Sequence, residues 1–328
     1  MLINNLYGGV KMNDKESFIR KNIEQRTERK ILPEEIWKDN PIYSIINAYA
    51  ETIILNECKN TKYNASVRFF FLIDKQINAL SMDIEGIRVI CMTTGTVELV
   101  PHLVYKMSQC KNFFKDYGSD MNPDEIVKEL TSYIFLHIFL HECGHVFEGH
   151  IQYLNANILD AECLTYSRIN HTQNKVSMDE KTLEYAADLY GTMYLAELFL
   201  TNCLSKREVL DKIRNIYAAL IFLYLILAVF SKDKGVDEVC VPITSRISEM
   251  LIKVLNDVTV FNIEVGDIHT ILQEIYPAIT IALYRITKLK SKDLVDYQDK
   301  NLLIEMEKID SHWNEIKEKV LKFSIWED

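Results

Sequence analysis

The segment from His141 to His145 reads His-Glu-Cys-Gly-His and matches the pattern H-E-x-x-H. On an α-helix, residues four positions apart lie on one face, with Cβ atoms about 5–6 Å apart. Two imidazoles at that spacing can bind one zinc ion at about 2.0–2.1 Å each. Glu142 lies about 100° further round the helix, where its carboxylate can take a proton from a water molecule at the metal and pass it to a leaving amine. The pattern therefore predicts hydrolysis with Glu142 as general base and acid.

A catalytic zinc site has three protein ligands and one open position, so a third ligand must come from elsewhere in the chain. The segment 181–188 offers Glu184 and Asp188, which lie four positions apart on one helix face. We expect Glu184 to bind zinc and Asp188 to accept a hydrogen bond from the free N–H of a ligand imidazole. The alternative third ligands are Glu180 and Glu162.

Two helices must position these side chains, and both have clear end signals. The first is expected to begin at residues 122–125, where Asn precedes Pro and two acidic residues, and to end at Gly149. The second is expected to begin at residues 177–180, where Ser and Glu form a capping box. Ala187 and Gly191 lie on the side of Glu184, and their small size allows the two helices to pack closely.

Other polar side chains near the motif have less specific roles. His137 lies one turn before His141 and about 12 Å along the helix axis from His145, so we expect it in the core or behind a ligand rather than on the metal. Cys143 points away from the ligand face and is expected to be a small buried hydrophobe. The sequence does not distinguish between four candidates for a further oxyanion donor, namely Arg246, His269, Tyr284 and Arg285.

The rest of the chain predicts a predominantly helical α+β fold. Three short runs rich in β-branched and aromatic residues suggest a small antiparallel sheet packed on the zinc-binding helix, at residues 67–73, 77–82 and 86–92. Few glycines and prolines punctuate the chain, with 10 Gly and 6 Pro in 328 residues, so long helices are expected elsewhere. The polar segment 155–176 is expected to be a loop. We divide the chain into a helical region at 1–65, a catalytic core at 66–205 and a helical region at 206–328.

The composition limits the partners and the compartment. A formal net charge of −10 argues against a nucleic-acid surface, which needs a basic face. The 7 cysteines are an odd number and form no C-x-x-C pair, so reduced thiols in the cytoplasm are expected, and the first residues lack the pattern of a signal peptide. The longest apolar run, 216–230, is shorter than the ~20 residues of a bilayer span. We expect a buried core helix there, with a membrane segment as the alternative.

The motifs resemble those of a known group of enzymes. H-E-x-x-H followed some forty residues later by E-x-x-x-D is similar to the signature of gluzincin metallopeptidases. Asn78-Ala79 and the later Gly95 resemble the segment that precedes the zinc helix in HtpX-like and CAAX-prenyl-protease-like peptidases. Residues 141–150 also look like the corresponding segment of Lit-type phage-exclusion and ImmA-like antirepressor peptidases. The resemblance covers residues 77–204, and it implies a zincin-like core in which an edge strand near Asn78 aligns the substrate backbone.

The chain also departs from related patterns. Metzincins have Gly three residues and His six residues after the second His of the motif, where this chain has Glu148 and Ile151, so His150 is not expected to bind the metal. HtpX-like enzymes carry a later His-Pro…Arg element, of which the segment 241–246 retains only Pro and Arg. They also have evident transmembrane helices. Both departures favour a relative that is soluble.

Together these features predict a cytoplasmic zinc metalloendopeptidase that cleaves a protein or peptide substrate and does not bind nucleic acid. His141, His145 and Glu184 are the expected zinc ligands, Glu142 the general base and Asp188 the residue that orients a ligand. The Lit-like segment suggests a role in phage exclusion or a stress response. The alternatives are a membrane-associated HtpX-like peptidase and a non-catalytic helical binding protein that zinc stabilises.

Overall fold

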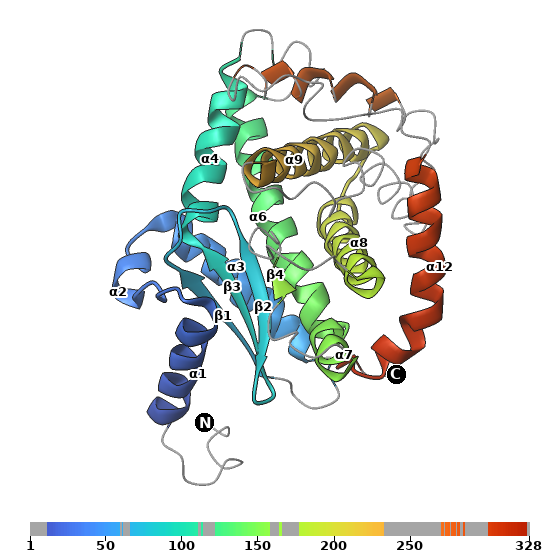
Figure 1. The fold of residues 1–328 in the computed structure, drawn as a ribbon. Helices are drawn as coiled ribbons and strands as arrows, with labels where there is room; N and C mark the ends of the chain where they lie inside the picture. Colours follow the sequence, from blue (N-terminus) through green and yellow to red (C-terminus); the bar gives the residue numbers. More distant parts are fainter. Residues whose placement is uncertain are drawn as a thin grey trace.

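A central helix, a small sheet and a set of surrounding helices form the fold in the computed structural model (Figure 1). The predominantly helical α+β class predicted from the sequence is confirmed. The structure describes residues 12–59, 61, 66–110, 113, 122–157, 164–165, 177–232 and 301–326, and several positions between 270 and 285.

The sheet is mixed, not purely antiparallel as predicted. Its strands are β1 (Val67–Leu72), β2 (Ala79–Ile84), β3 (Ile87–Thr93) and β4 (Leu164–Thr165), in the order β1-β3-β2-β4. β2 turns back onto β3 through Glu85 and Gly86, both with positive φ, which suits a tight hairpin turn. β3 thereby lies between β2 and β1 and runs parallel to β1. The prediction of a purely antiparallel sheet is wrong because the β2–β3 hairpin places β3 beside β1 in parallel orientation.

The two faces of the sheet contact different helices. Side chains alternate along β3, so that Val89 and Cys91 belong to one hydrophobic cluster whereas Ile90 and Met92 belong to the main core. The first cluster is completed by Ile19 and other residues of α1 (Met12–Thr27). On the other face the main core includes residues from α3 (Pro41–Cys58), which follows the short helix α2 (Glu34–Trp37), and from the central helix.

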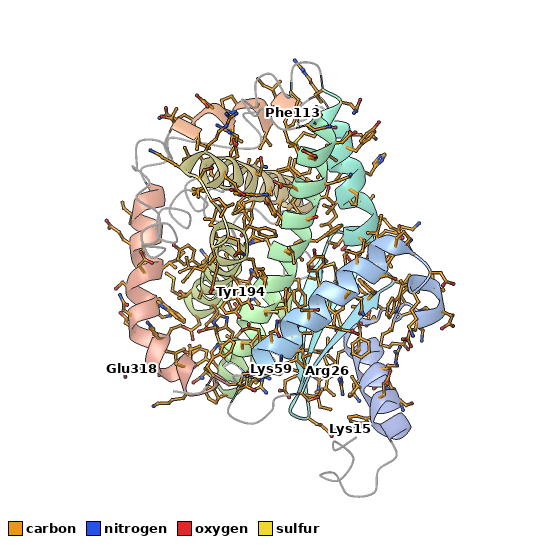
Figure 2. The ribbon with its side chains drawn as sticks, turned by 180° about the vertical axis from the view of Figure 1, so that it is seen from behind. Lys15, Arg26, Lys59, Phe113, Tyr194 and Glu318 are labelled. Carbon is orange, nitrogen blue, oxygen red and sulfur yellow. The ribbon has the colours of Figure 1, made fainter. Side chains whose placement is uncertain are left out.

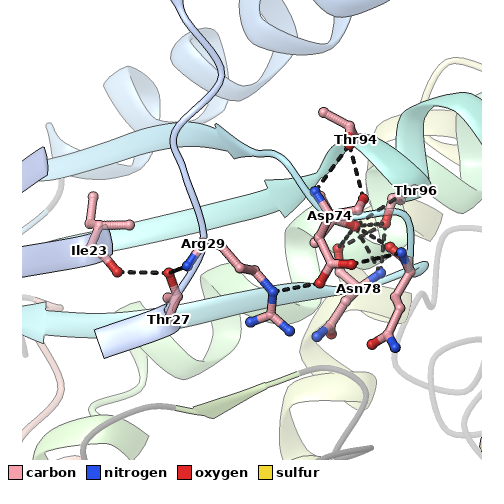
Figure 3. A network of polar contacts seen from close by, with 9 residues as sticks. Ile23, Thr27, Arg29, Asp74, Asn78, Thr94 and Thr96 are labelled. Carbon is pink, nitrogen blue, oxygen red and sulfur yellow. Dashed lines mark hydrogen bonds and ion pairs between the residues drawn. The ribbon is translucent and has the colours of Figure 1, made fainter. Parts of the chain in front are cut away.

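A network of hydroxyl groups ties the loop between β1 and β2 to the start of α4 (Thr94–Ser108), as Figure 3 shows. The Thr93 hydroxyl caps α4 and donates to the carbonyl of Gln76 at 2.6 Å, and Thr94 donates to the carbonyl of Asp74 at 2.9 Å. The backbone N–H of Asn78 donates to Thr96 at 2.8 Å. These bonds fix the backbone of the residues that directly precede β2.

The central helix is α6 (Pro123–Phe147), and its predicted ends are confirmed. The Asn122 side chain accepts from the N–H of Asp124, and Pro123 occupies the first turn. Every residue from Tyr133 to Phe147 is buried, which is expected of a helix surrounded by other elements. Gly149 has φ +81°, and a Cβ there would lie 2.4 Å from the carbonyl carbon of Phe323, so the turn after α6 requires glycine.

The helices after α6 differ in part from the prediction. α7 (His150–Asn157) starts directly after Gly149 and occupies the beginning of the predicted loop, and β4 pairs with β2 inside it. The expected loop at 155–176 is therefore wrong at residues 155–157 and 164–165, and its other residues lie outside the described part of the chain. α8 (Met178–Leu200) begins with the predicted capping box between Ser177 and Glu180.

α8 packs closely against α6, as its small residues predict. A Cβ on Gly191 would lie 3.1 Å from the backbone N of His141, and a Cβ on Gly144 would lie 3.1 Å from the Cα of Ala187. Both distances are tighter than ordinary van der Waals contact. The small side chains therefore permit an approach that brings the ligand face of α6 to the face of α8 that carries Glu184.

The apolar run at 216–230 belongs to α9 (Lys206–Lys232), and its residues 216–224 are buried in the main core. Among the described helices, none has both the length and the apolar character that a bilayer crossing requires. The last helix, α12 (Asn301–Leu321), packs against α8 and α7. The main core draws on residues from each of the three predicted regions, and the division at 65 and 205 stays a prediction.

Candidate metal centre

The structure brings together the three side chains predicted as zinc ligands. The Nε2 atoms of His141 and His145, both on α6, lie 3.0 Å apart. Glu184 on α8 has one carboxylate oxygen 3.5 Å from Nε2 of His141 and the other 3.7 Å from Nε2 of His145. Among the described residues, the donor atoms of His141, His145 and Glu184 lie close enough together to hold a metal ion.

The spacing of the donor atoms fits a zinc ion. Three donors bound tetrahedrally at 2.0–2.2 Å lie about 3.3–3.6 Å from one another, close to the separations of 3.0, 3.5 and 3.7 Å found here. Two imidazoles and one carboxylate are a donor set used by catalytic zinc sites. The two histidines are buried, whereas the Glu184 side chain is 15% exposed. Of the three side chains, Glu184 is therefore the one that is exposed to solvent.

Asp188 lies where the prediction places it, behind one of the imidazoles. Its Oδ1 is 2.7 Å from Nδ1 of His141, and both side chains are buried. Because a carboxylate accepts, Nδ1 of His141 carries the proton, and Nε2 presents its lone pair to the centre of the group. His137 lies behind this pair, with Nε2 4.0 Å from Asp188 and 3.2 Å from the Tyr224 hydroxyl. It is a buried residue away from the donor atoms, as predicted.

The residue behind the other imidazole was missed by the sequence analysis. Nδ1 of His145 lies 3.0 Å from Nδ1 of His150, the first residue of α7, which is buried. Burial lowers the pKa of His150 to about 3, so its ring is neutral near pH 7. His150 is not among the grouped donor atoms, in agreement with its predicted exclusion as a ligand. The turn at Gly149 is the sequence signal that could have placed it, because a glycine with positive φ changes the direction of the chain just before His150.

Glu142 and Cys143 follow His141 on α6 and are both buried. The carboxylate of Glu142 is not part of the ligand group, as its position on the helix predicts. Burial raises the pKa of the Cys143 thiol well above its usual value, which keeps it protonated and supports the predicted role as a buried hydrophobe.

The structure describes two of the other candidate residues, Glu180 and Arg285. Glu180 accepts the backbone N–H of Ser177 at 2.8 Å in the capping box and is absent from the ligand group. Of the oxyanion candidates, Arg285 is exposed and lies near Cys110 at the end of α4. The remaining candidates lie outside the described residues, namely Glu162, Arg246, His269 and Tyr284.

Strand β2, expected to be a free edge near Asn78, has a neighbour on each side. Leu80 and Ser81 pair with Thr165 and Leu164 of β4. At these two residues β4 occupies the position beside β2 where a substrate strand would have to lie. The expectation of a free edge is therefore wrong at Leu80 and Ser81, because β4 pairs with β2 there.

Tyr194 on α8, labelled in Figure 2, contacts a buried acid, Glu57, on α3. The Tyr194 hydroxyl on α8 donates to the carboxylate of Glu57 on α3, and Glu57 is 9% exposed. Burial raises the pKa of Glu57, and the nearby Glu197 raises it further, whereas the bond from Tyr194 opposes the shift. The ionised form of this carboxyl is therefore costly in the folded protein.

Glu57→Gln is expected to stabilise the protein near pH 7 by about 1 kcal/mol, because the amide oxygen can still accept from Tyr194 and carries no charge. A raised folded-state pKa means that the folded protein binds the proton more tightly, so the wild type loses stability as pH rises from about 4 through that pKa. Denaturant unfolding at pH 4 and pH 7 should show the advantage of the variant growing with pH. An advantage that is equal at both values would contradict the assignment.

Comparisons of the chain with protein-family models, with curated proteins and with solved structures found no match. The resemblance to gluzincins therefore stays a prediction, and function has to be inferred from the residues and their geometry.

Proposed function

We propose that the protein is a zinc-dependent metallopeptidase that hydrolyses peptide bonds of a protein substrate. The observation that carries the proposal is the convergence of His141, His145 and Glu184 beside the buried Glu142. This arrangement combines a three-ligand donor set with an acid-base residue that is not a ligand. A structural zinc site has four protein ligands as a rule, and the described residues offer three here.

Each side chain has a separate task in this proposal. Bound zinc would lower the pKa of a coordinated water to about 7 and polarise a carbonyl group. Glu142 accepts the proton of the attacking water on its carboxylate and donates it to the leaving amine nitrogen. Asp188 holds the His141 ring in the tautomer that presents Nε2. Burial of these groups strengthens their electrostatic interactions relative to water.

The cellular role is inferred from weaker support. The resemblance of residues 141–150 to Lit-type peptidases suggests phage exclusion or a stress response. A cytoplasmic location is supported by the free cysteines among the described residues and by the odd cysteine count. The proposed substrate is a protein or peptide, whose hydrolysis releases an amine that Glu142 can protonate.

Removal of zinc is expected to stop proteolysis, and one equivalent of zinc per chain should restore it. The purified full-length protein is stripped with a chelator, reloaded, and incubated with a denatured whole-cell protein extract, after which new amino termini are counted by mass spectrometry. Inhibitors of serine and cysteine proteases are present throughout. Cleavage that persists after stripping would contradict the proposal. A protein that holds one zinc and generates no new termini would be a zinc-stabilised binding protein instead.

A further inference from the structure

The two imidazoles of the metal centre are supported by different chemical groups. His141 has a carboxylate behind it, Asp188, at 2.7 Å. His145 has another imidazole behind it, that of His150, at 3.0 Å between the two Nδ1 atoms. A ligand imidazole that binds through Nε2 must carry its proton on Nδ1, and that N–H needs an acceptor when it is buried. His145 is buried, and Nδ1 of His150 lies within hydrogen-bond distance of its Nδ1.

We infer that His150 is a positioning residue of the metal centre, whose Nδ1 accepts the Nδ1–H of His145 and so fixes the tautomer and the ring orientation in which His145 binds zinc. The inference rests on the zinc site of the proposed function. It assigns no contact between His150 and the metal or a substrate, because His150 acts through His145 alone.

Zinc binding through Nε2 of His145 determines where the protons of the two rings lie. With metal, Nε2 of His145 must be free of its proton. The proton of His145 then lies on Nδ1 and the proton of His150 on Nε2. Each ring then carries one proton.

The surroundings hold His150 in place. It follows Gly149, whose positive φ sets the direction in which α7 leaves α6. The ring of Trp313 on α12 lies edge-on to it, with centroids 6.3 Å apart. One residue earlier on α12, His312 bonds Asp179 at the start of α8 at 2.6 Å. These contacts connect α7, α8 and α12, so His150 is presented to His145 by a fixed framework and not by a mobile surface side chain.

Zinc affinity of the full-length protein tests the inference, measured by competition with a chromophoric chelator. His150→Ala removes the acceptor and is expected to weaken zinc binding by about 10–100-fold, the usual effect of losing a group that orients a ligand. His150→Asn places an amide oxygen near the position of Nδ1 and should stay within about threefold of the wild type. His102→Ala, an exposed histidine on α4, is the matched control and should bind as the wild type does.

Two further measurements separate positioning from general structural damage. Substitution of cobalt for zinc should give altered visible absorption bands in His150→Ala and wild-type bands in His150→Asn, since the bands report ligand geometry. Nitrogen-15 NMR of histidine rings in the zinc-loaded wild type should show His145 protonated on Nδ1 and His150 on Nε2. This experiment is done on the wild-type protein, and His150→Asn is needed only to assign the ring signals of His150.

Three results would overturn the inference: wild-type zinc affinity in His150→Ala, an equal loss in both His150 variants when each is folded by circular dichroism, or a proton that stays on Nδ1 of His150 in the loaded protein. Each result comes from zinc affinity or from NMR of the zinc-loaded protein, and none of them depends on turnover. Failure of the proposed function, with zinc bound and nothing cleaved, is therefore distinguishable from failure of this inference.

Discussion

Glu142→Gln is expected to slow peptide hydrolysis by about 10²–10⁴-fold, the contribution of a general acid-base residue, while zinc stays bound at one per chain. Glutamine has nearly the same shape as glutamate but cannot accept the proton of the attacking water. The ligand atoms of His141, His145 and Glu184 are untouched by the change. Turnover of a cleaved peptide, once a substrate is found in the extract experiment, gives the rate, and metal analysis gives the stoichiometry.

The same substitution at Glu125 is the matched control, because Glu125 is an exposed glutamate in the first turn of the same helix. Glu125→Gln should leave the rate within about twofold of the wild type, as expected of a surface change distant from the reacting groups. A Glu142→Gln protein that keeps its full rate shows that another group is the base. A variant that loses zinc shows that Glu142 supports the ligands as well.

Much of the centre could be predicted because its signals are local. The ends of α6 depend on the side chain of Asn122 and on the glycine at 149, and the start of α8 depends on a hydroxyl and a carboxylate three residues apart. Helical spacing then places His141 and His145 on one face. The approach of α8 was predictable from Ala187 and Gly191, since small residues on the ligand side permit close packing.

The remaining features depend on contacts between distant parts of the chain. The parallel pairing of β1 with β3 follows from how the hairpin folds onto β1, and no single strand pattern encodes it. The pairing of β4 with β2 joins residues about eighty positions apart. His150 was excluded as a ligand by motif spacing, but its contact with His145 needs the direction of the turn at Gly149. Trp313 reaches that site from the far end of the chain.

Glu184→Gln is expected to weaken zinc binding by more than about 100-fold, beyond the loss that follows from removing a group behind a ligand. The amide has no negative charge, so the donor set would no longer offset part of the charge of Zn²⁺ with a carboxylate. Zinc that binds the folded state stabilises it by RT ln(1 + [L]/Kd), so a 100-fold loss of affinity removes about 2.7 kcal/mol of zinc-dependent stability when zinc is in excess. Thermal unfolding with and without zinc measures this difference, and chelator competition measures the affinity.

Glu180→Gln on the same helix is the matched control and also tests the alternative ligand. Glu180 lies one turn before Glu184 and accepts the N–H of Ser177 in the capping box, a role that glutamine can also fill. Its zinc affinity and its zinc-dependent stability should equal those of the wild type. If Glu180→Gln lost zinc and Glu184→Gln kept it, the carboxylate of the centre would belong to the first turn of α8, and the separations of 3.5 and 3.7 Å between Glu184 and the imidazoles would not describe the loaded site.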